Sequence, residues 1–270
     1  MAQDPWQLTG AGPESYKRYQ VPSVFGPLAR ILVRHAALRP GQRVLDLACG
    51  TGVVAQEAAS LLGRAGSIVG LDLNAGMLEI ACRHAPAGGA TVEWRQGDAG
   101  ALPLSNADFD AVLCQQGLQF FPDRPAALRE SHRVLRPGGL AAFCVWRGIE
   151  HSPCHSAVVA ALRRHASDDV AHRFQAPFGF GDGAALERLL REVGFREVEV
   201  RVEALERRLL PPEESIPGLL ASTPVGPEVA ALPESARRAI VAEVAAALAR
   251  YRDGDGFVIP QPTHVAVARN

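Results

Sequence analysis

The chain has few cysteines and no long apolar segment. These features argue against a disulfide-stabilised protein and a membrane-spanning protein. Its 270 residues include 5 cysteines, without a C-x-x-C pair, which suits a reducing compartment better than a disulfide framework. No segment approaches the roughly 18 uninterrupted apolar residues of a transmembrane helix, and the N-terminus lacks a basic segment followed by an apolar one. We therefore expect a cytoplasmic protein that does not bind membranes.

An excess of charge of one sign is also missing. The 28 basic and 29 acidic residues leave a formal net charge of -1, so no bulk positive field attracts nucleic acid. The composition, 47% apolar and 6% aromatic, is that of an ordinary globular protein. A chain of this length forms one main domain with elaborations.

What the sequence does contain is an alternation of short apolar segments with longer amphipathic ones, typical of βαβ units. It predicts strands at 43–47, 67–71, 91–95, 109–114, 140–146, 198–204 and 263–268. It predicts helices at 53–62, 75–83, 125–135, 153–173, 183–193 and from residue 234 onward. The expected fold is α/β, a Rossmann-like three-layer sandwich with a mostly parallel seven-stranded sheet and helical lid insertions.

We expect three regions within one globular unit. Residues 1–40 form an N-terminal helical cap, with a helix over 14–38 that Pro22 and Pro27 break or bend. Residues 41–148 form the core, and residues 149–270 contribute substrate-side insertions and the last strands. Within them, residues 174–180, FQAPFGF, form an aromatic loop.

The most informative segment is VLDLACGTGVVA, which runs from a strand through a tight turn into a helix. Gly50 and Gly52 allow a ligand to approach the backbone, and the helix that follows offers unpaired N–H groups. Asp72 lies twenty residues after Gly52, where a carboxylate can accept both hydroxyls of a ribose. With Ala55, these glycines also fit the dinucleotide fingerprint, so the motif alone leaves an NAD(P)-dependent oxidoreductase open.

Five segments in order extend this motif: LDLACGTG, GLDLNAGML, WRQGDAGALPL, FDAVLCQQGLQFF and RVLRPGGLAAF. Together they resemble the motifs of class I S-adenosylmethionine-dependent methyltransferases. The resemblance is strongest to the type 11 subgroup, which includes ubiquinone and menaquinone C-methyltransferases. It covers residues 44–145 and implies S-adenosyl-L-methionine as cofactor and S-adenosyl-L-homocysteine as product.

The resemblance also implies roles for individual residues. Asp46 would bind the amino end of the cofactor's methionine part and Asp72 its ribose, while Met77 would pack near the adenine. Asp98 would accept from the adenine amino group, and the Ala99 N–H would donate to the ring. The remaining expected cofactor contacts are Ala48, Gly50, Gly52, Leu73, Gly97, Gln115 and, from the N-terminal helix, Tyr16.

The reactive end of the cofactor is expected near Gln115 and Gln116, beyond the carboxyl ends of the strands. His151 and His155 follow the fifth predicted strand, where a general base for a phenol, an acid or an acidic carbon would lie, and we prefer His151. With Cys154 they form no complete metal-ligand set, so we predict no metal.

The N-terminal helix and the insertions 149–180 and 211–250 are expected to wall a substrate pocket. Their apolar content, including Phe174, Phe178 and Phe180, favours a small, fairly apolar metabolite such as a quinone, phenol or polyketide.

Three functional hypotheses follow from these patterns. A small-molecule methyltransferase accounts for all five motifs. An NAD(P)-dependent oxidoreductase is weakened because Lys17 is the only lysine, which excludes a Tyr-x-x-x-Lys pair. A non-catalytic S-adenosylmethionine-binding module is disfavoured because every acidic and glycine position of the cofactor loop is intact. The acceptor molecule, the acceptor atom and the oligomeric state stay open.

Overall fold

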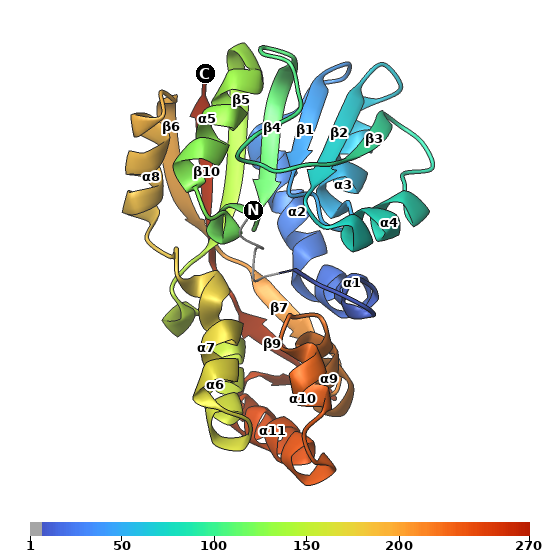
Figure 1. The fold of residues 1–270 in the computed structure, drawn as a ribbon, viewed down its shortest axis with the longest axis vertical. Helices are drawn as coiled ribbons and strands as arrows, with labels where there is room; N and C mark the ends of the chain where they lie inside the picture. The colour runs from blue at the N-terminus through green and yellow to red at the C-terminus, as the bar shows by residue number, and fades with distance from the viewer. Residues whose placement is uncertain (1–6) are drawn as a thin grey trace. The chain divides into compact units, whose positions relative to one another are not determined.

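The computed structural model describes residues 7–270 and divides into two compact units (Figure 1). The sheet unit comprises Gly26–Val145, Asp182–Glu203 and His264–Asn270. The second unit comprises Trp146–Gly181, Ala204–Thr263 and the described part of residues 1–25. Within the described residues, no helix combines the length and the apolar character that crossing a membrane requires. The predicted three-part division of the chain stays a prediction.

The sheet unit is built on a seven-stranded sheet with the order β3-β2-β1-β4-β5-β10-β6 (Figure 1). The strands are β1 Arg43–Leu47, β2 Ser67–Asp72, β3 Thr91–Gln96, β4 Phe109–Gln115, β5 Leu135–Trp146, β6 Arg196–Glu203 and β10 Thr263–Arg269. Strands β1 to β5 pair in parallel. At the start of β5, Gly138 N donates to Asn270 O just after the end of β10, so β10 runs antiparallel. The predicted mostly parallel Rossmann-like sheet is confirmed.

The strand order reverses between β1 and β4, which makes this pair the topological switch point of the sheet. The helices of the unit are α2 Gly26–Ala36, α3 Val53–Leu62, α4 Ala75–Arg83, the short η2 Leu118–Phe120, α5 Arg124–Val134 and α8 Gly183–Glu192. Helices α3 and α4 have the predicted bounds. Strand β5 begins five residues earlier than expected, because Leu135 already pairs with Phe109 across a register shift in β4.

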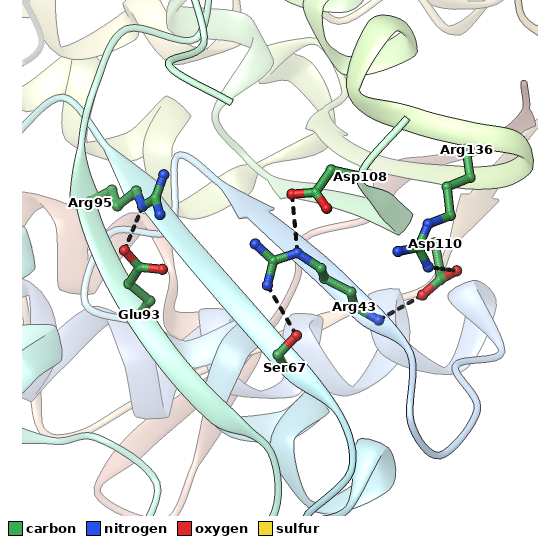
Figure 2. Close-up of polar contacts among 7 residues, drawn as sticks. All are labelled: Arg43, Ser67, Glu93, Arg95, Asp108, Asp110 and Arg136. Atoms are coloured by element: carbon green, nitrogen blue, oxygen red, sulfur yellow. Dashed lines mark hydrogen bonds and ion pairs between the residues drawn. The ribbon is translucent and has the colours of Figure 1, made fainter. Parts of the chain in front are cut away.

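Ion pairs hold together the sheet edge at which the parallel strands begin (Figure 2). The Arg43 side chain donates to Asp108 Oδ2 and Ser67 Oγ, both at 3.2 Å, and its backbone N donates to Asp110 Oδ2 at 2.7 Å. Arg136 Nη1 donates to the other oxygen of Asp110 at 2.6 Å. Each carboxylate there has a cationic or N–H partner, so this edge is a structural feature.

The second unit contains the helical segments α1 Gly12–Ser15, η1 Tyr16–Phe25, η3 Ile149–His151, α6 Pro153–His165, α7 Asp168–Gln175, η4 Ala176–Phe178, α9 Pro212–Ala221, α10 Gly226–Ala230, α11 Glu234–Ala247 and η5 Ala249–Tyr251. It also contains an antiparallel sheet with the order β7-β9-β8, made of Glu206–Leu209, Gly256–Pro260 and Arg252–Asp253. The sequence did not predict this sheet, because its strands have at most five residues and β7 and β8 consist mainly of charged residues.

Two predictions of secondary structure were wrong in this unit, one of a helix and one of a loop. The single helix predicted over 153–173 is two helices, because Ser167 Oγ accepts from Val170 N and caps the start of α7. The predicted aromatic loop 174–180 instead begins inside α7 and continues as a single 3₁₀ turn, η4.

The segment predicted as one bent helix over 14–38 is three consecutive helical elements, α1, η1 and α2. Pro22 lies inside the π-helix η1, which lacks the regular i to i−4 pattern that proline disrupts. Pro27 is the second residue of α2, which begins directly after the end of η1.

Candidate functional site

The turn between β1 and α3 has a backbone that few side chains tolerate. Ala48, Gly50 and Gly52 have φ angles of 54°, 54° and 78°. A Cβ on Gly52 would lie 2.4 Å from the Trp94 ring, so that position also requires glycine for space. Gly52 is the N-cap of α3 and supplies no capping side chain. The turn therefore presents backbone at a helix N-terminus, which suits an anionic group.

Asp46 on β1 is a buried carboxyl whose two oxygens differ. Its exposed fraction is 1%, and its Oδ2 accepts from Ala55 N in the first turn of α3 at 3.0 Å. Its Oδ1 has no hydrogen-bond partner among the described residues. Burial raises the pKa of Asp46 to about 8, and the nearby charge of Asp72 adds to the rise. A cationic donor beside Oδ1 would satisfy this oxygen and favour the ionised form.

Asp72, the last residue of β2, connects the loops on either side of it. Its Oδ2 accepts from Gly50 N at 2.7 Å and its Oδ1 from Asn74 N at 2.8 Å. The Asn74 side chain in turn caps α4 by accepting from Met77 N at 3.1 Å. Asp72 therefore determines where the glycine turn and the start of α4 lie relative to each other.

The other predicted cofactor residues of the sheet unit lie around these loops. Met77 extends toward the glycine turn, with its Cε 3.6 Å from where a Cβ on Gly50 would stand. Leu73 is 44% exposed. Gly97 N donates to Asp72 O at 3.0 Å, which joins the ends of β2 and β3. Asp98 Oδ1 accepts from Gly100 N at 2.8 Å, forming a tight turn around the buried Ala99.

The loop after β4 approaches the glycine turn. Gln116, directly after Gln115, has a left-handed φ of 56°, and its N donates to Cys144 O on β5. A Cβ on Gly117 would lie 2.6 Å from the Ala48 Cβ, so these two loops are in contact. The structure thus brings together the loops that follow β1, β2 and β4.

Two buried polar side chains here were missed by the sequence analysis. Thr51 is 1% exposed and Gln119 is 4% exposed. Neither the Thr51 hydroxyl nor either end of the Gln119 amide has a hydrogen-bond partner among the described residues. Buried polar atoms are rarely left in this state, so each one that occurs marks a place where a bound molecule could supply the partner. Thr51 lies within the glycine motif itself, which is the signal that could have identified it.

The two candidate general bases belong to the second unit and differ in their surroundings. His151 Nε2 lies 2.9 Å from Arg147 Nη2, which can only donate, so this nitrogen accepts. His155 is 8% exposed, its Nδ1 lies 2.9 Å from Ser152 Oγ, and its ring packs against Phe174 and Phe178. Burial lowers the pKa of His155 well below the ordinary value. His155 therefore has the orienting partner that the sequence did not reveal.

Tyr16 also belongs to the second unit, where its ring stacks on Phe25 with the ring centroids 5.0 Å apart. Of the aromatic residues predicted to line a pocket, Phe174 and Phe178 are buried and Phe180 is partly buried. Among residues 7–270, no three His, Cys, Asp or Glu side chains are grouped in a way that would hold a metal ion. The prediction that the protein uses no metal stays a prediction.

Residues 44–139 match the family model described as a methyltransferase domain. The 2-phytyl-1,4-naphtoquinone methyltransferase of Synechococcus elongatus is 40% identical over 116 residues, 42% of this chain and 50% of that protein. The demethylmenaquinone methyltransferase of Staphylococcus saprophyticus is 28% identical over 181 residues, 63% of this chain and 77% of that protein. The chain spans about half the length of most of the curated relatives it matches.

Solved structures with low sequence identity share the fold. The YcgJ protein of Bacillus subtilis superposes with a TM-score of 0.60 at 17% identity, covering 90% of this chain and 97% of that chain. A phosphoethanolamine N-methyltransferase of Haemonchus contortus, solved with S-adenosylhomocysteine, superposes with a TM-score of 0.55 at 19% identity, covering 90% of this chain and 52% of that chain. At these identities the superpositions establish the fold alone.

Proposed function

We propose that this chain, which carries a methyltransferase domain at residues 44–139, is an S-adenosylmethionine-dependent methyltransferase that acts on a small molecule. The observation that carries the proposal is Asp46, a buried carboxyl with one oxygen unpaired among the described residues, next to a turn that presents backbone N–H groups. A ligand with an amino group and a carboxylate side by side satisfies both features, and the methionine end of S-adenosylmethionine is such a ligand.

The residues of the sheet unit fit this cofactor from end to end. Asp46 would accept from its amino group, and the start of α3 after Gly52 would bind its carboxylate. Asp72 would bind the ribose while it holds Gly50 in place. Met77 would pack on the adenine, and Asp98 and Ala99 would bind the edge of that ring.

Four further predicted contacts come from the segments around this site. Ala48 and Leu73 would contribute apolar surface, and Gly97 would leave room beside the adenine. Gln115, at the end of β4, would lie beside the reactive end of the cofactor. Tyr16 stays a proposed contact from the second unit.

The bound cofactor supplies an electrophilic methyl group on its sulfonium. The chain's task is to hold the acceptor atom in line with that group, exclude water and remove a proton where the acceptor carries one. His151 and His155 are the two candidates for the last task. In the tautomer whose Nδ1 donates to Ser152 Oγ, the Nε2 atom of His155 bears the lone pair of a base, and burial makes this base weaker than an ordinary histidine.

The proposed acceptor is a small, fairly apolar metabolite of the quinone or phenol kind. Relatives named for quinone methylation support this class. The segments predicted to wall a substrate pocket, 149–180 and 211–250, both fall within the second unit and carry much of its buried apolar cluster.

Calorimetric titration of the purified chain with S-adenosylmethionine, S-adenosylhomocysteine, NAD(H) and NADP(H) tests the proposal. We expect micromolar binding of the first two ligands and none of the nicotinamide cofactors. Nicotinamide binding in their place would support the oxidoreductase instead. Binding of S-adenosylhomocysteine without turnover of any phenol or quinone offered would support a non-catalytic binding module.

The general base is tested by comparing His155→Ala with His151→Ala. If His155 is the base, its loss lowers turnover by roughly 10²-fold or more and leaves S-adenosylhomocysteine affinity unchanged. His151→Ala then has a small effect. The reverse result would assign the role to His151.

A further inference from the structure

The second unit buries a cation without an anionic partner. Arg207 on β7 is 1% exposed, and its guanidinium donates to Gln261 Oε1 at 2.7 Å, Gln20 Oε1 at 2.8 Å and Ser23 Oγ at 3.2 Å. All three acceptors are neutral. No carboxylate of the described residues pairs with this guanidinium, and none of its hydrogen bonds uses Nη2. Burying a charge without a counter-ion costs free energy of desolvation, and binding of an anion would offset this cost.

The neighbours of Arg207 are fixed in their orientations. Gln20 Nε2 donates to Ser222 Oγ at 2.7 Å, which keeps the carbonyl end of Gln20 toward the guanidinium. Gln261 is 1% exposed, and its backbone N donates to Leu205 O at 2.7 Å. Its side-chain Nε2 is a buried donor with no partner among residues 7–270. Two donors of the network, Arg207 Nη2 and Gln261 Nε2, therefore have no acceptor among residues 7–270. A donor next to a buried cation is the complement of an oxyanion.

A cavity of about 240 Å³ adjoins this network. Its lining residues are Arg18, Tyr19, Gln20, Pro22, Ser23, Arg207, Arg208, Leu209, Leu210, Ser215 and Leu219. Three of them are arginines and none is acidic, while leucines and a proline supply apolar surface. Gln20 and Ser23 belong both to the wall and to the hydrogen bonds of Arg207. The cavity thus offers a positive end and an apolar wall.

We propose that this cavity binds the carboxylate of a small organic acid. A charge-assisted bond from Arg207 Nη2 would hold the carboxylate, and the leucines of the lining would hold the ring or chain attached to it. The volume of about 240 Å³ lies just below the range of ligand pockets, roughly 300–1,000 Å³, and suits a single aromatic ring or the acidic end of a larger molecule.

The first test compares two probes of nearly the same shape, the anion 4-hydroxybenzoate and the neutral amide 4-hydroxybenzamide, by calorimetry on the wild-type chain. The carboxylate is expected to bind about tenfold more tightly or better, as a charge-assisted bond in a buried site requires. Equal affinities, or binding of neither probe, overturn the proposal. This comparison needs no variant.

Variants then locate the effect. Arg207→Met is expected to abolish the preference for the carboxylate, and Arg207→Lys to keep part of it, because the charge stays while the planar fork is lost. Arg163→Met removes the same charge from an exposed position on α6, away from the cavity, and should keep the full preference. A preference that survives Arg207→Met overturns the assignment to this residue.

A parallel titration with S-adenosylhomocysteine separates the two proposals. If it binds and the carboxylate preference is absent, the anion site fails and the methyltransferase stands. If the Arg207-dependent preference is present and S-adenosylhomocysteine does not bind, the methyltransferase fails and the anion site stands.

Discussion

The polar groups at the two edges of the large sheet, where the parallel strands begin and where they end, differ in whether they have hydrogen-bond partners. Where the parallel strands begin, Arg43, Asp110 and Arg136 satisfy one another at the surface. Where they end, Asp46, Thr51 and Gln119 are buried with polar atoms unpaired among the described residues. The first edge is complete without a ligand. The second has buried polar atoms that a ligand would satisfy, which is why we propose the cofactor site there.

Of the substitutions that test this difference between the two edges, one at Asp46 is expected to have the largest effect. Asp46→Ala removes the oxygen proposed to accept from the cofactor's amino group, and S-adenosylhomocysteine affinity is expected to fall by roughly 100-fold, the upper range for a hydrogen bond to a charged group. Calorimetry measures the loss. Asp108→Ala, which removes a carboxylate from the opposite edge, is the matched control and should leave affinity unchanged. Equal affinity for both variants and the wild type would remove Asp46 from the site.

Asp72 is expected to have the next largest effect. Asp72→Ala removes the proposed ribose contact and also releases Gly50 N, so affinity should fall by roughly tenfold or more. Gly50 N loses its acceptor in Asp72→Asn only if the amide turns its nitrogen toward it, so this variant should retain more affinity. If Asp72→Ala lost thermal stability but kept its affinity, the residue would be structural alone.

The raised pKa of Asp46 predicts that the stability of the protein depends on pH, which tests the burial of this carboxyl. Its pKa is raised from 3.8 to about 8, so between these values the folded state holds a proton that the unfolded state has lost. Stability in the absence of cofactor should therefore fall as pH rises from about 4 towards 8. Urea unfolding of the wild type and of Asp46→Asn measures this slope, which the variant should lose. An identical slope in both would mean that Asp46 is ionised throughout.

The smallest effect is expected at the opposite edge. Arg43→Met breaks a half-exposed ion pair with Asp108, and the free energy of unfolding should fall by about 1 kcal/mol or less. S-adenosylhomocysteine affinity should not change. A large loss of affinity in this variant would show that the two edges are coupled, and the comparison would then fail.

The parts of the fold that the sequence predicted best are those in which local pattern and burial agree. Helices α3 and α4 begin and end where capping and glycine signals indicate, and all seven strands of the large sheet were found. The small sheet was missed because nothing in the sequence distinguishes the buried Arg207 from the exposed arginines around it. Leu205, Arg207 and Leu209 are buried at every second position, which is the signal that was available, and pairing with β9 makes this segment a strand.

The candidate site divides in the same way. The positions of Asp46, Gly50 and Asp72 could be read from the sequence. Asp46 and Gly50 stand at the end of one predicted strand and in the turn after it, and Asp72 stands at the end of the next predicted strand. The contact between Ser152 and His155 could not be predicted in this way, because these residues are three positions apart and their contact depends on how η3 leads into α6.

The sequence by itself determined the Rossmann-like sheet and the methyltransferase motifs, because both depend on local hydrophobic alternation and on glycine and acidic residues at short spacing. Only the tertiary structure decided which polar groups are buried without a partner. Asp46 Oδ1, the Gln119 amide and Gln261 Nε2 have that status among the described residues because segments distant in the chain exclude water around them, which no local pattern records.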